Sequence, residues 1–420
     1  MNKSYFHRKN CRLCEGRDIE LVAPLQKIPL TEKYLETKNH NRVNELFPID
    51  LYMCKKCHCV QILDVIDPNI LWDDFTFRSG QAKIIVEHLN DVATKIVEKF
   101  KIKPGSLIID VGSNDGTLLL GYKKQKMNVL GVDPAEKIAQ EANKAGVKTI
   151  SEFLDENLSE SIVKGYGKAK VVNCFNAFAH ADDMIGLTKS IKNLIDKDGI
   201  FVFEVSYLVD IIEKTLLGTI IHEHLCHYSI ITLNIFFQKF GLEFIDVERN
   251  PFQGGSIIGV VQHVNGKFKK SKNVEKLLKY EKENGFNTIE KIKTFSVNLK
   301  EVSAELNKLL QKWENEKKNI AGYGAARSGT TLIAEFNLGK KINYIFDDHF
   351  QKVNKYTPGD LIEVVPTKEI CNRMPDITFI LAWVHEEKII SNNHAYLEKG
   401  GCFISILPEI KIITKKNIQS

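Results

Sequence analysis

Four cysteines near the N-terminus have the spacing of a metal site. Cys11 and Cys14 form one Cys-x-x-Cys pair, and Cys54 and Cys57 form a second. Each pair can present two thiolates from a tight turn to the same ion, and four thiolates in a closed tetrahedron favour zinc. Because a segment of about 60 residues has too small a core to fold unaided, we expect the zinc to be structural. Two unrelated pairs of buried cysteines are the alternative interpretation.

A second concentration of reactive groups lies in the middle of the chain. His222, Glu223 and His224 gather two imidazoles and a carboxylate within three residues. They lie near an apolar stretch, where such groups are costly unless they find partners. Acid–base catalysis is one interpretation, and a surface turn or a metal-binding pair is the other.

A glycine-rich turn between a strand and a helix predicts a ligand site. The apolar run Leu107–Val111 predicts a strand, and a helix is expected from Thr117. Glycines in such a turn let the backbone approach a ligand closely, and the helix N-terminus favours a carboxylate or phosphate. The turn consists of Gly112, Ser113, Asn114, Asp115 and Gly116.

The strand that follows indicates a nucleoside ligand. The run Asn128–Val132 ends at Asp133, and an acid at the tip of the second strand is placed to bind both ribose hydroxyls. Because the turn GSNDG lacks the third glycine of the dinucleotide fingerprint, S-adenosylmethionine fits better than NAD. An NAD-dependent oxidoreductase is the competing interpretation.

The elements that must position these residues alternate between strands and helices. Helical periodicity is present at 81–100 and 185–194, and apolar runs at 171–175 and 200–204 predict further strands. Long helices are expected within 267–318. A second strand, glycine turn and helix follow from residue 319, with further strands at 344–347 and 377–383. The fold class predicted is therefore α/β, with a doubly wound sheet and two Rossmann-like halves.

Composition limits the classes of partner. The chain has 420 residues, 43% hydrophobic and 26% charged, as expected for a globular protein of two to four domains. Its 58 basic and 53 acidic residues are spread along the chain, which argues against a nucleic-acid partner. No stretch approaches the ~18 apolar residues of a membrane span, and the N-terminus lacks an apolar signal region. We expect a cytoplasmic protein without a membrane partner.

Four stretches together carry a recognisable pattern. They are IIDVGSNDGTLL (108–119), NAFAHADD (176–183), FVFEVSYLVDIIEKTLLGTIIHEHLCHYS (201–229) and QGGS (253–256). In them the chain resembles the sugar C-methyltransferases that act on nucleotide-linked keto-deoxysugars, and the resemblance extends over nearly the whole chain. It implies a zinc-binding module at 1–68, a class I S-adenosylmethionine-dependent methyltransferase domain at 69–265, and a helical connector with a C-terminal Rossmann-like domain that binds the nucleotide sugar at 266–420.

The resemblance also implies a reaction and its residues. A methyl group would pass from S-adenosylmethionine to a carbon beside a ketone, after a base has formed the enolate. His224 would be the base, Glu223 would orient or polarise the sugar, and His180 would steady the enolate, with His222 completing the catalytic set. The donor would be held by the turn 112–116, by Asp133 and by Asn176.

The chain departs from the family pattern at several positions. Ile221 replaces a tyrosine, Ile258 replaces an arginine, and Ser328, Thr330 and Val384 replace polar residues of the C-terminal domain. Because the first two changes make the site less polar, O-methylation of a nucleotide-linked sugar or a related polysaccharide precursor is the alternative reaction. A binding protein that keeps the donor site without transferring the methyl group is a third interpretation.

Overall fold

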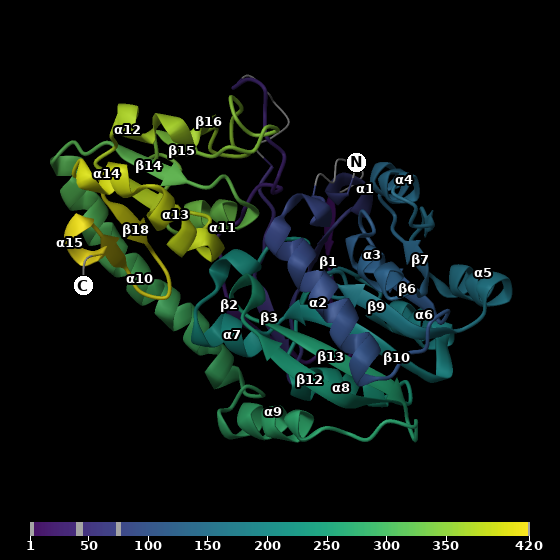
Figure 1. The fold of residues 1–420 in the computed structure, drawn as a ribbon. Helices are drawn as coiled ribbons and strands as arrows, with labels where there is room; N and C mark the ends of the chain where they lie inside the picture. The colour runs from purple at the N-terminus through teal and green to yellow at the C-terminus, as the bar shows by residue number, and fades with distance from the viewer. Residues whose placement is uncertain (1–3, 39–44, 73–76, 419–420) are drawn as a thin grey trace.

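The computed structural model describes residues 4–38, 45–72 and 77–418, which form three regions. In Figure 1 the C-terminal region lies at the left, the large central sheet at the right, and the N-terminal region between and behind them. None of the helices in these ranges combines the length and the apolarity that a bilayer crossing requires.

The central region is a seven-stranded sheet in the order β12-β13-β10-β9-β6-β7-β8. Its strands are β6 (Leu107–Val111), β7 (Asn128–Val132), β8 (Thr149–Ile150), β9 (Ala169–Phe175), β10 (Ile195–Ser206), β12 (Leu242–Asn250) and β13 (Ser256–His263). The sheet is parallel except for β13, which pairs antiparallel with β10 and β12. The carboxyl ends of β6, β7, β9 and β10 therefore meet at one edge, where such sheets bind ligands.

Helices cover both faces of this sheet. They are α2 (Lys83–Lys99), α3 (Thr117–Lys124), α4 (Glu136–Lys144), α5 (Glu156–Tyr166), α6 (Met184–Leu194), α7 (Leu208–Glu213) and α8 (Ile230–Gln238). Side chains of α2 and α3 bury into one hydrophobic cluster, and those of α5, α6 and α8 bury into the other. On α2 the buried residues recur every three or four positions, which is the amphipathic pattern that predicted this helix. The doubly wound α/β prediction is confirmed.

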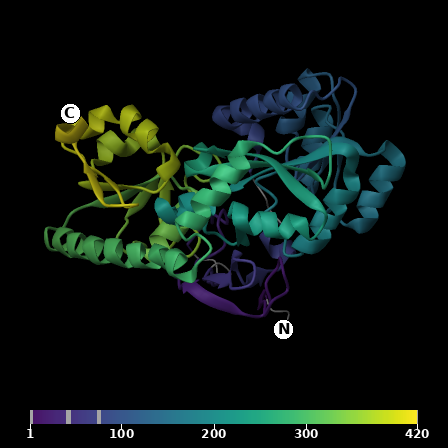
Figure 2. The same ribbon diagram turned by 90° about the horizontal axis from the view of Figure 1, so that it is seen from below.

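The C-terminal region has a six-stranded sheet in the order β16-β15-β14-β17-β18-β19. Its strands are β14 (Ile320–Tyr323), β15 (Tyr344–Phe346), β16 (Glu363–Val365), β17 (Ile377–Ile380), β18 (Phe403–Ser405) and β19 (Lys411–Ile413). Its helices are α11 (Arg327–Glu335), α12 (Ile370–Arg373), α13 (Glu386–Asn392), α14 (His394–Glu398) and α15 (Lys415–Ile418). The long helices expected within 267–318 are α9 (Lys272–Glu283) and α10 (Ile289–Asn315). Figure 2 shows α10 lying along this sheet, where Trp313 packs 6.2 Å from Phe379.

Two strands differ from their expected lengths by more than two residues. The strand predicted at 377–383 ends at Ile380, because Ala382 donates to the carbonyl of Tyr323 that already accepts the amide of Leu381, so the pairing goes no further. The strand predicted at 200–204 is extended to Ile195–Ser206, with an irregularity in its pairing between Ile195 and Ile200.

The N-terminal region contains β1 (Tyr5–His7), β2 (Ile19–Ala23), β3 (Leu51–Cys54), β4 (Val60–Ile62) and β5 (Asp64–Ile66), followed by α1 (Pro68–Leu71). Its larger sheet has the order β11-β4-β3-β2. The strand β11 (Cys226–His227) comes from the middle of the chain and pairs antiparallel with β4. The residues that follow His224 are therefore part of the N-terminal sheet.

Candidate functional site

The four predicted zinc ligands converge on one point. The Sγ atoms of Cys11 and Cys57 lie 3.5 Å apart, as do those of Cys14 and Cys54, and all four lie within 4.8 Å of one another. A tetrahedron with Zn–S bonds of about 2.3 Å separates its sulfurs by about 3.8 Å. The donor set therefore fits a structural zinc ion.

Arg12 lies between the first two of these cysteines. It connects the zinc module to the two loops that carry His180 and His224, here called the histidine loops. Its side chain is buried, its Nε donates to Asp182 Oδ1 at 3.0 Å, and its Nη1 donates to the carbonyl of Leu225 at 3.4 Å. Asp182 lies two residues after His180, and Leu225 follows His224 directly. Folding of the zinc module thus positions both loops.

His224 is held in one tautomer. Its Nδ1 lies 2.6 Å from the carbonyl oxygen of Thr219. Because a carbonyl only accepts, Nδ1 carries the proton and Nε2 is the basic nitrogen. Burial lowers the pKa of His224, with Arg327 adding to this, although the hydrogen bond to Thr219 and the charge of Glu223 oppose it. The imidazole is therefore neutral at pH 7.

His180 stacks on His224, with ring centroids 5.3 Å apart and planes 18° from parallel. Burial, together with His224 and Arg327, holds the pKa of His180 well below its usual range. Its Nε2 is buried and has no hydrogen-bond partner among the described residues. The two neutral imidazoles form one face of the candidate site.

Glu223 supplies a carboxylate next to these rings. Its Oε1 accepts a hydrogen bond from Thr31 Oγ1 at 3.0 Å and lies 3.7 Å from Nη1 of Arg327, while its Oε2 is buried and finds no partner in the described ranges. Burial alone would raise the pKa of Glu223, but Arg327 and His222 outweigh it and the pKa is lowered. Glu223 is therefore ionised.

His222 points elsewhere. Its ring packs edge-on against Phe47, 5.6 Å away, and its Nε2 lies 3.4 Å from the carbonyl of Phe47. Burial lowers the pKa of His222 to about 4. The structure thus brings His180, Glu223 and His224 together but directs His222 toward the N-terminal region.

The glycine turn lies at the carboxyl end of β6, as expected. Gly112 has φ +74°, and a Cβ at this position would lie 2.5 Å from the Cβ of Ala177. Asp133 at the tip of β7 accepts the amides of Asn114 at 2.8 Å and Ala135 at 2.9 Å, so its carboxylate holds the turn itself. Nearby, the backbone N–H of Asn176, directly after β9, donates to the carbonyl of Glu204. These close approaches fit a backbone that cradles a ligand.

The remaining side chains of the turn hold the segment that precedes α2. Asn114 Oδ1 accepts the amide of Ser79 at 3.0 Å, and Asp115 Oδ2 accepts the amide of Gly80 at 2.8 Å. Asn114 Nδ2 also donates to the carbonyl of Phe77 at 3.1 Å. Ser113 Oγ is buried, and Gly116, with φ +80°, precedes α3. Sequence reasoning missed this use of Asn114 and Asp115, because no spacing pattern connects them to residues 77–80.

Three protein-family models match successive parts of the chain. "Putative zinc binding domain" matches residues 11–72, "Methyltransferase domain" matches 85–247, and "C-methyltransferase C-terminal domain" matches 251–408. The chain is a methyltransferase, and its C-terminal part matches a domain of the C-methyltransferases. As a methyltransferase it uses S-adenosylmethionine as its donor, and its four-cysteine cluster binds zinc.

The chain is similar to individual proteins over different shares of its length. It is 29% identical over 408 residues to the C-methyltransferase NovU of Streptomyces niveus, covering 97% of each chain. It is 25% identical over 204 residues to a tRNA U34 carboxymethyltransferase of Campylobacter lari, covering 46% of this chain and 68% of that one. The crystal structure of magnesium protoporphyrin IX methyltransferase from Synechocystis PCC 6803 with bound SAH matches 47% of this chain and 100% of its own, at 15% identity and a TM-score of 0.36.

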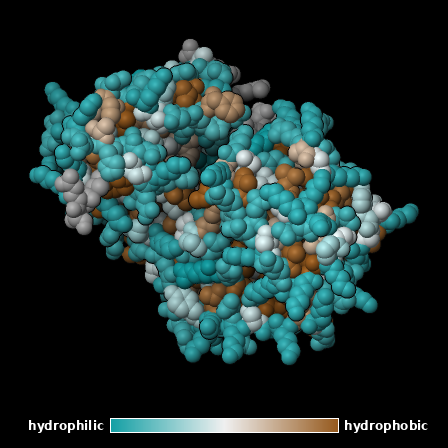
Figure 3. Space-filling view, viewed as in Figure 1, coloured by the Kyte–Doolittle hydropathy of each residue, from teal (hydrophilic) through white to brown (hydrophobic). Residues whose placement is uncertain are grey.

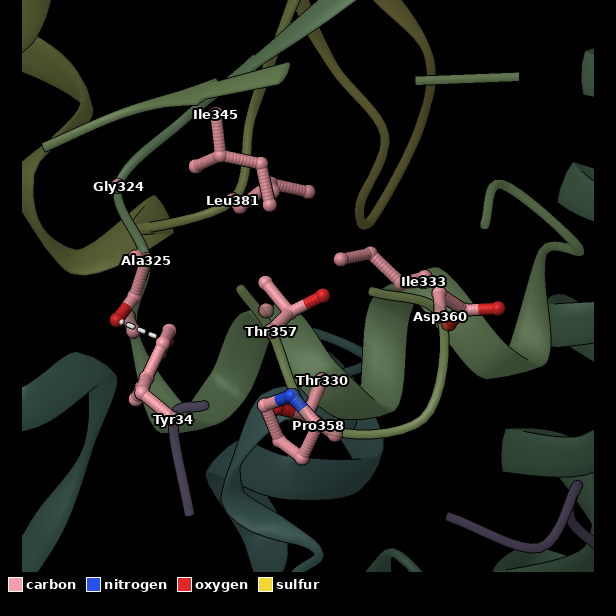
Figure 4. Close-up of a pocket in the computed structure, with 12 residues that line it drawn as sticks. Tyr34, Gly324, Ala325, Thr330, Ile333, Ile345, Thr357, Pro358, Asp360 and Leu381 are labelled. Atoms are coloured by element: carbon pink, nitrogen blue, oxygen red, sulfur yellow. Dashed lines mark hydrogen bonds between the residues drawn. The ribbon is translucent and has the colours of Figure 1, made fainter. Parts of the chain in front are cut away.

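A cavity lies at the glycine turn of the C-terminal region (Figure 4). It is lined by Thr330, Thr357, Asp360 and apolar side chains. Tyr34 of the N-terminal region contributes to its wall and donates its hydroxyl to the carbonyl of Ala325 at 2.7 Å. The first and last regions of the chain therefore meet at this turn.

The central and C-terminal regions also meet close to the histidines. Trp383 packs against two glycines of the central region: an added Cβ would lie 2.4 Å from its ring at both Gly218 and Gly254. Thr331 of α11 donates its hydroxyl to the carbonyl of Ile220 at 3.1 Å. In the space-filling view the surface is hollowed between the two lobes (Figure 3). The turn that carries Glu223 and His224 is thus held by all three regions.

Proposed function

We propose that this methyltransferase methylates a nucleotide-linked sugar at a carbon beside a ketone. The observation that carries the proposal is the bond between His224 Nδ1 and the carbonyl of Thr219 at 2.6 Å, which leaves Nε2 as the basic nitrogen. A neutral, buried imidazole can accept a proton from the weakly acidic C–H beside a ketone. The full-length likeness to NovU supports transfer to carbon.

The reaction begins with proton removal by His224 Nε2. The C–H electrons form a carbon–carbon double bond, and the electron pair of the ketone moves onto its oxygen. His180, whose Nε2 has no partner within the described part of the chain, would contact that oxygen. S-adenosylmethionine, when bound, supplies an electrophilic methyl group on a sulfonium. The enolate carbon would take this methyl as the bond between the methyl and sulfur breaks, so that S-adenosylhomocysteine leaves with the electron pair. The carbonyl is restored, and the proton on His224 passes to solvent.

The remaining roles follow the same proposal. The turn 112–116, Asp133 and Asn176 hold the donor at the carboxyl ends of β6, β7 and β9. Glu223 orients the sugar. His222 faces Phe47, so we assign it a packing role rather than one in the reaction. We keep 1–68, 69–265 and 266–420 as the domain boundaries, with the last domain binding the nucleotide sugar.

A single incubation tests the proposal. The enzyme, S-adenosylmethionine and a panel of keto and non-keto nucleotide-linked sugars are combined in heavy water, and each sugar is followed by mass spectrometry and NMR. We expect a new methyl on carbon, or deuterium at the carbon beside the ketone, and neither with His224→Gln. A methyl on oxygen without deuterium exchange would reassign the enzyme as an O-methyltransferase.

A further inference from the structure

Arg327 reaches the candidate site from the C-terminal region. It is the first residue of α11, directly after the second glycine turn. This helix is docked against the residues that precede Glu223: Thr331 bonds to the carbonyl of Ile220, and a Cβ on Gly218 would come within 2.5 Å of the Cβ of Ser328. The start of α11 is therefore packed against the turn that carries Glu223 and His224, here called the histidine turn.

The guanidinium of Arg327 lies between two carboxylates from the other regions. Its Nη1 is 3.7 Å from Glu223 Oε1, and its Nε is 3.8 Å from Glu32 Oε1. Glu32 also bonds at 2.8 Å to Lys352, which is itself buried and bonded to the carbonyl of Ala325. Within the described ranges, Arg327 is the cation whose ion pair reaches Glu223.

A cation at this site would stabilise the negative charge that forms during the reaction. His180 and His224 are neutral, and Glu223 carries one negative charge. An enolate formed beside Glu223 would add a second negative charge in a buried setting, where like charges repel strongly. A guanidinium at the same place offsets that cost, because it stays protonated and its N–H groups only donate. Arg327 lowers the pKa of His180, Glu223 and His224, so its field acts on the reacting groups themselves.

We propose that Arg327 is a catalytic residue that binds the acceptor oxygen on which negative charge develops. This rests on the proposed function above. When His224 Nε2 takes the proton from carbon, the electron pair ends on the ketone oxygen, and a guanidinium N–H donates to that oxygen without giving up its proton. The active site is then composite, because the base and His180 come from the central region and the charged oxyanion partner comes from the C-terminal region.

The test separates proton removal from methyl transfer. Deuterium wash-in from heavy water into a keto nucleotide sugar, measured at saturating acceptor without donor, reports enolate formation alone. We expect Arg327→Gln to slow wash-in by about 10²- to 10³-fold, the usual effect of losing one oxyanion donor. Arg327→Lys keeps the charge and should recover part of the rate. Arg373→Gln, which removes a surface arginine paired with Glu369 in the same region, should exchange at the wild-type rate.

The pH dependence gives a second measurement. Arg327 disfavours the charged form of His224, so its removal raises the pKa of His224. The acid limb of the wash-in profile should therefore move to higher pH in Arg327→Gln and stay in place in Arg373→Gln. Arg327→Lys keeps the charge and should leave the acid limb near its wild-type position, whereas a loosened fold would displace the limb in both variants, because burial also lowers this pKa.

Two results would overturn the inference while leaving the proposed function intact. Wild-type wash-in at saturating acceptor with a raised KM would mean that Arg327 binds another anionic part of the acceptor, such as its diphosphate. Wild-type wash-in and KM together would mean that it is not involved. Donor affinity reports folding, and if Arg327→Gln no longer binds S-adenosylmethionine, the neutral variant Arg327→Met decides by the same criteria. Failure of the wild-type enzyme itself to exchange or methylate any keto sugar would instead reject the proposed function.

Discussion

The rings of His180 and His224 are stacked, with centroids 5.3 Å apart and planes 18° from parallel. His180 comes from the loop after β9 and His224 from the turn before β11, so the pair forms only when these two segments pack together. Each ring would repel a positive charge on the other, and burial disfavours charge on both. The arrangement therefore keeps a neutral base next to a neutral hydrogen-bonding partner.

Replacing the base should stop chemistry without weakening donor binding. We expect His224→Gln to lower kcat by about 10²- to 10⁴-fold, the contribution typical of general-base catalysis. His394→Gln, at an exposed histidine on α14, is the matched control. Steady-state kinetics and calorimetric titration with S-adenosylmethionine measure the two effects, and a His224→Gln enzyme within threefold of the wild-type kcat would move the base elsewhere.

Zinc and Arg12 should affect catalysis by different routes. Cys54→Ser should lose both the metal and activity, because the N-terminal sheet includes β11 and its folding positions His224. Arg12→Gln should retain zinc but lower kcat, because it loses the bonds to Asp182 and Leu225 that hold the histidine loops. Metal analysis beside kinetics distinguishes them, with Cys371→Ser, at a half-buried cysteine of the C-terminal region, as the control. Full activity in a zinc-free enzyme would refute this coupling.

Gly112 and Gly105 differ in the space that a Cβ would find, and this difference can be tested by substitution. Both glycines have positive φ, +74° and +79°, but a Cβ meets Ala177 at 2.5 Å in the first case and nothing within 4 Å in the second. Gly105→Ala should cost about 1–3 kcal/mol of stability from backbone strain alone. Gly112→Ala should cost more and weaken S-adenosylmethionine binding at least about tenfold, since the turn must shift. Equal donor affinity in both variants would contradict a donor site at this turn.

Two buried histidines should make stability depend on pH. Burial lowers the pKa of His222 to about 4 and that of His227 to about 3, from an ordinary value of 6.5. Below pH 6.5 the unfolded chain therefore binds protons that the folded chain does not. The free energy of unfolding thus falls as the pH falls toward the two lowered pKa values, and these histidines leave it unchanged above pH 6.5. Each histidine contributes about 1.4 kcal/mol per pH unit in that window.

The variant His227→Phe isolates one of these groups. Urea unfolding is measured at about pH 7.5, 6.0 and 5.0, which lie on both sides of the ordinary histidine pKa of about 6.5. The free energy of unfolding should fall less steeply with falling pH in the variant than in the wild type. Comparing the two slopes cancels the carboxylates, including Asp110, whose pKa burial raises to about 8. Parallel slopes would mean that His227 is protonated or exposed in the folded protein.

The contact of Trp383 with Gly218 should couple the C-terminal region to acceptor use. A Cβ on Gly218 would lie 2.4 Å from Trp383 Nε1 and 2.5 Å from the Cβ of Ser328, so Gly218→Ala must push α11 away from the histidine turn. We expect kcat/KM for the acceptor to fall at least about tenfold while donor affinity is kept. Gly165→Ala on α5, where a Cβ meets nothing within 4 Å, is the control. An unaffected kcat/KM would show that the two regions act independently.

Features that depend only on residues close together in the sequence were predicted from the sequence. The Cys-x-x-Cys spacing, the strand, glycine turn and helix at 107–124, and the second such unit from residue 319 all follow from local rules of turn chemistry and periodicity. The same rules overestimated the strand at 377–383, because its pairing ends where Leu381 and Ala382 donate to one carbonyl, that of Tyr323, a residue far away in sequence.

Only the tertiary structure decided which reactive groups face one another. The triplet at 222–224 gives no sign that His222 faces Phe47 while His224 stacks on His180. Likewise, no spacing links Arg12 to Asp182 or Arg327 to Glu223. Such pairs depend on how three separately formed sheets pack, and that packing is set by the shape and burial of whole surfaces rather than by any pattern within a short window. The sequence by itself determined the elements and their reactive residues, and the packing of the three regions decided their arrangement into a site.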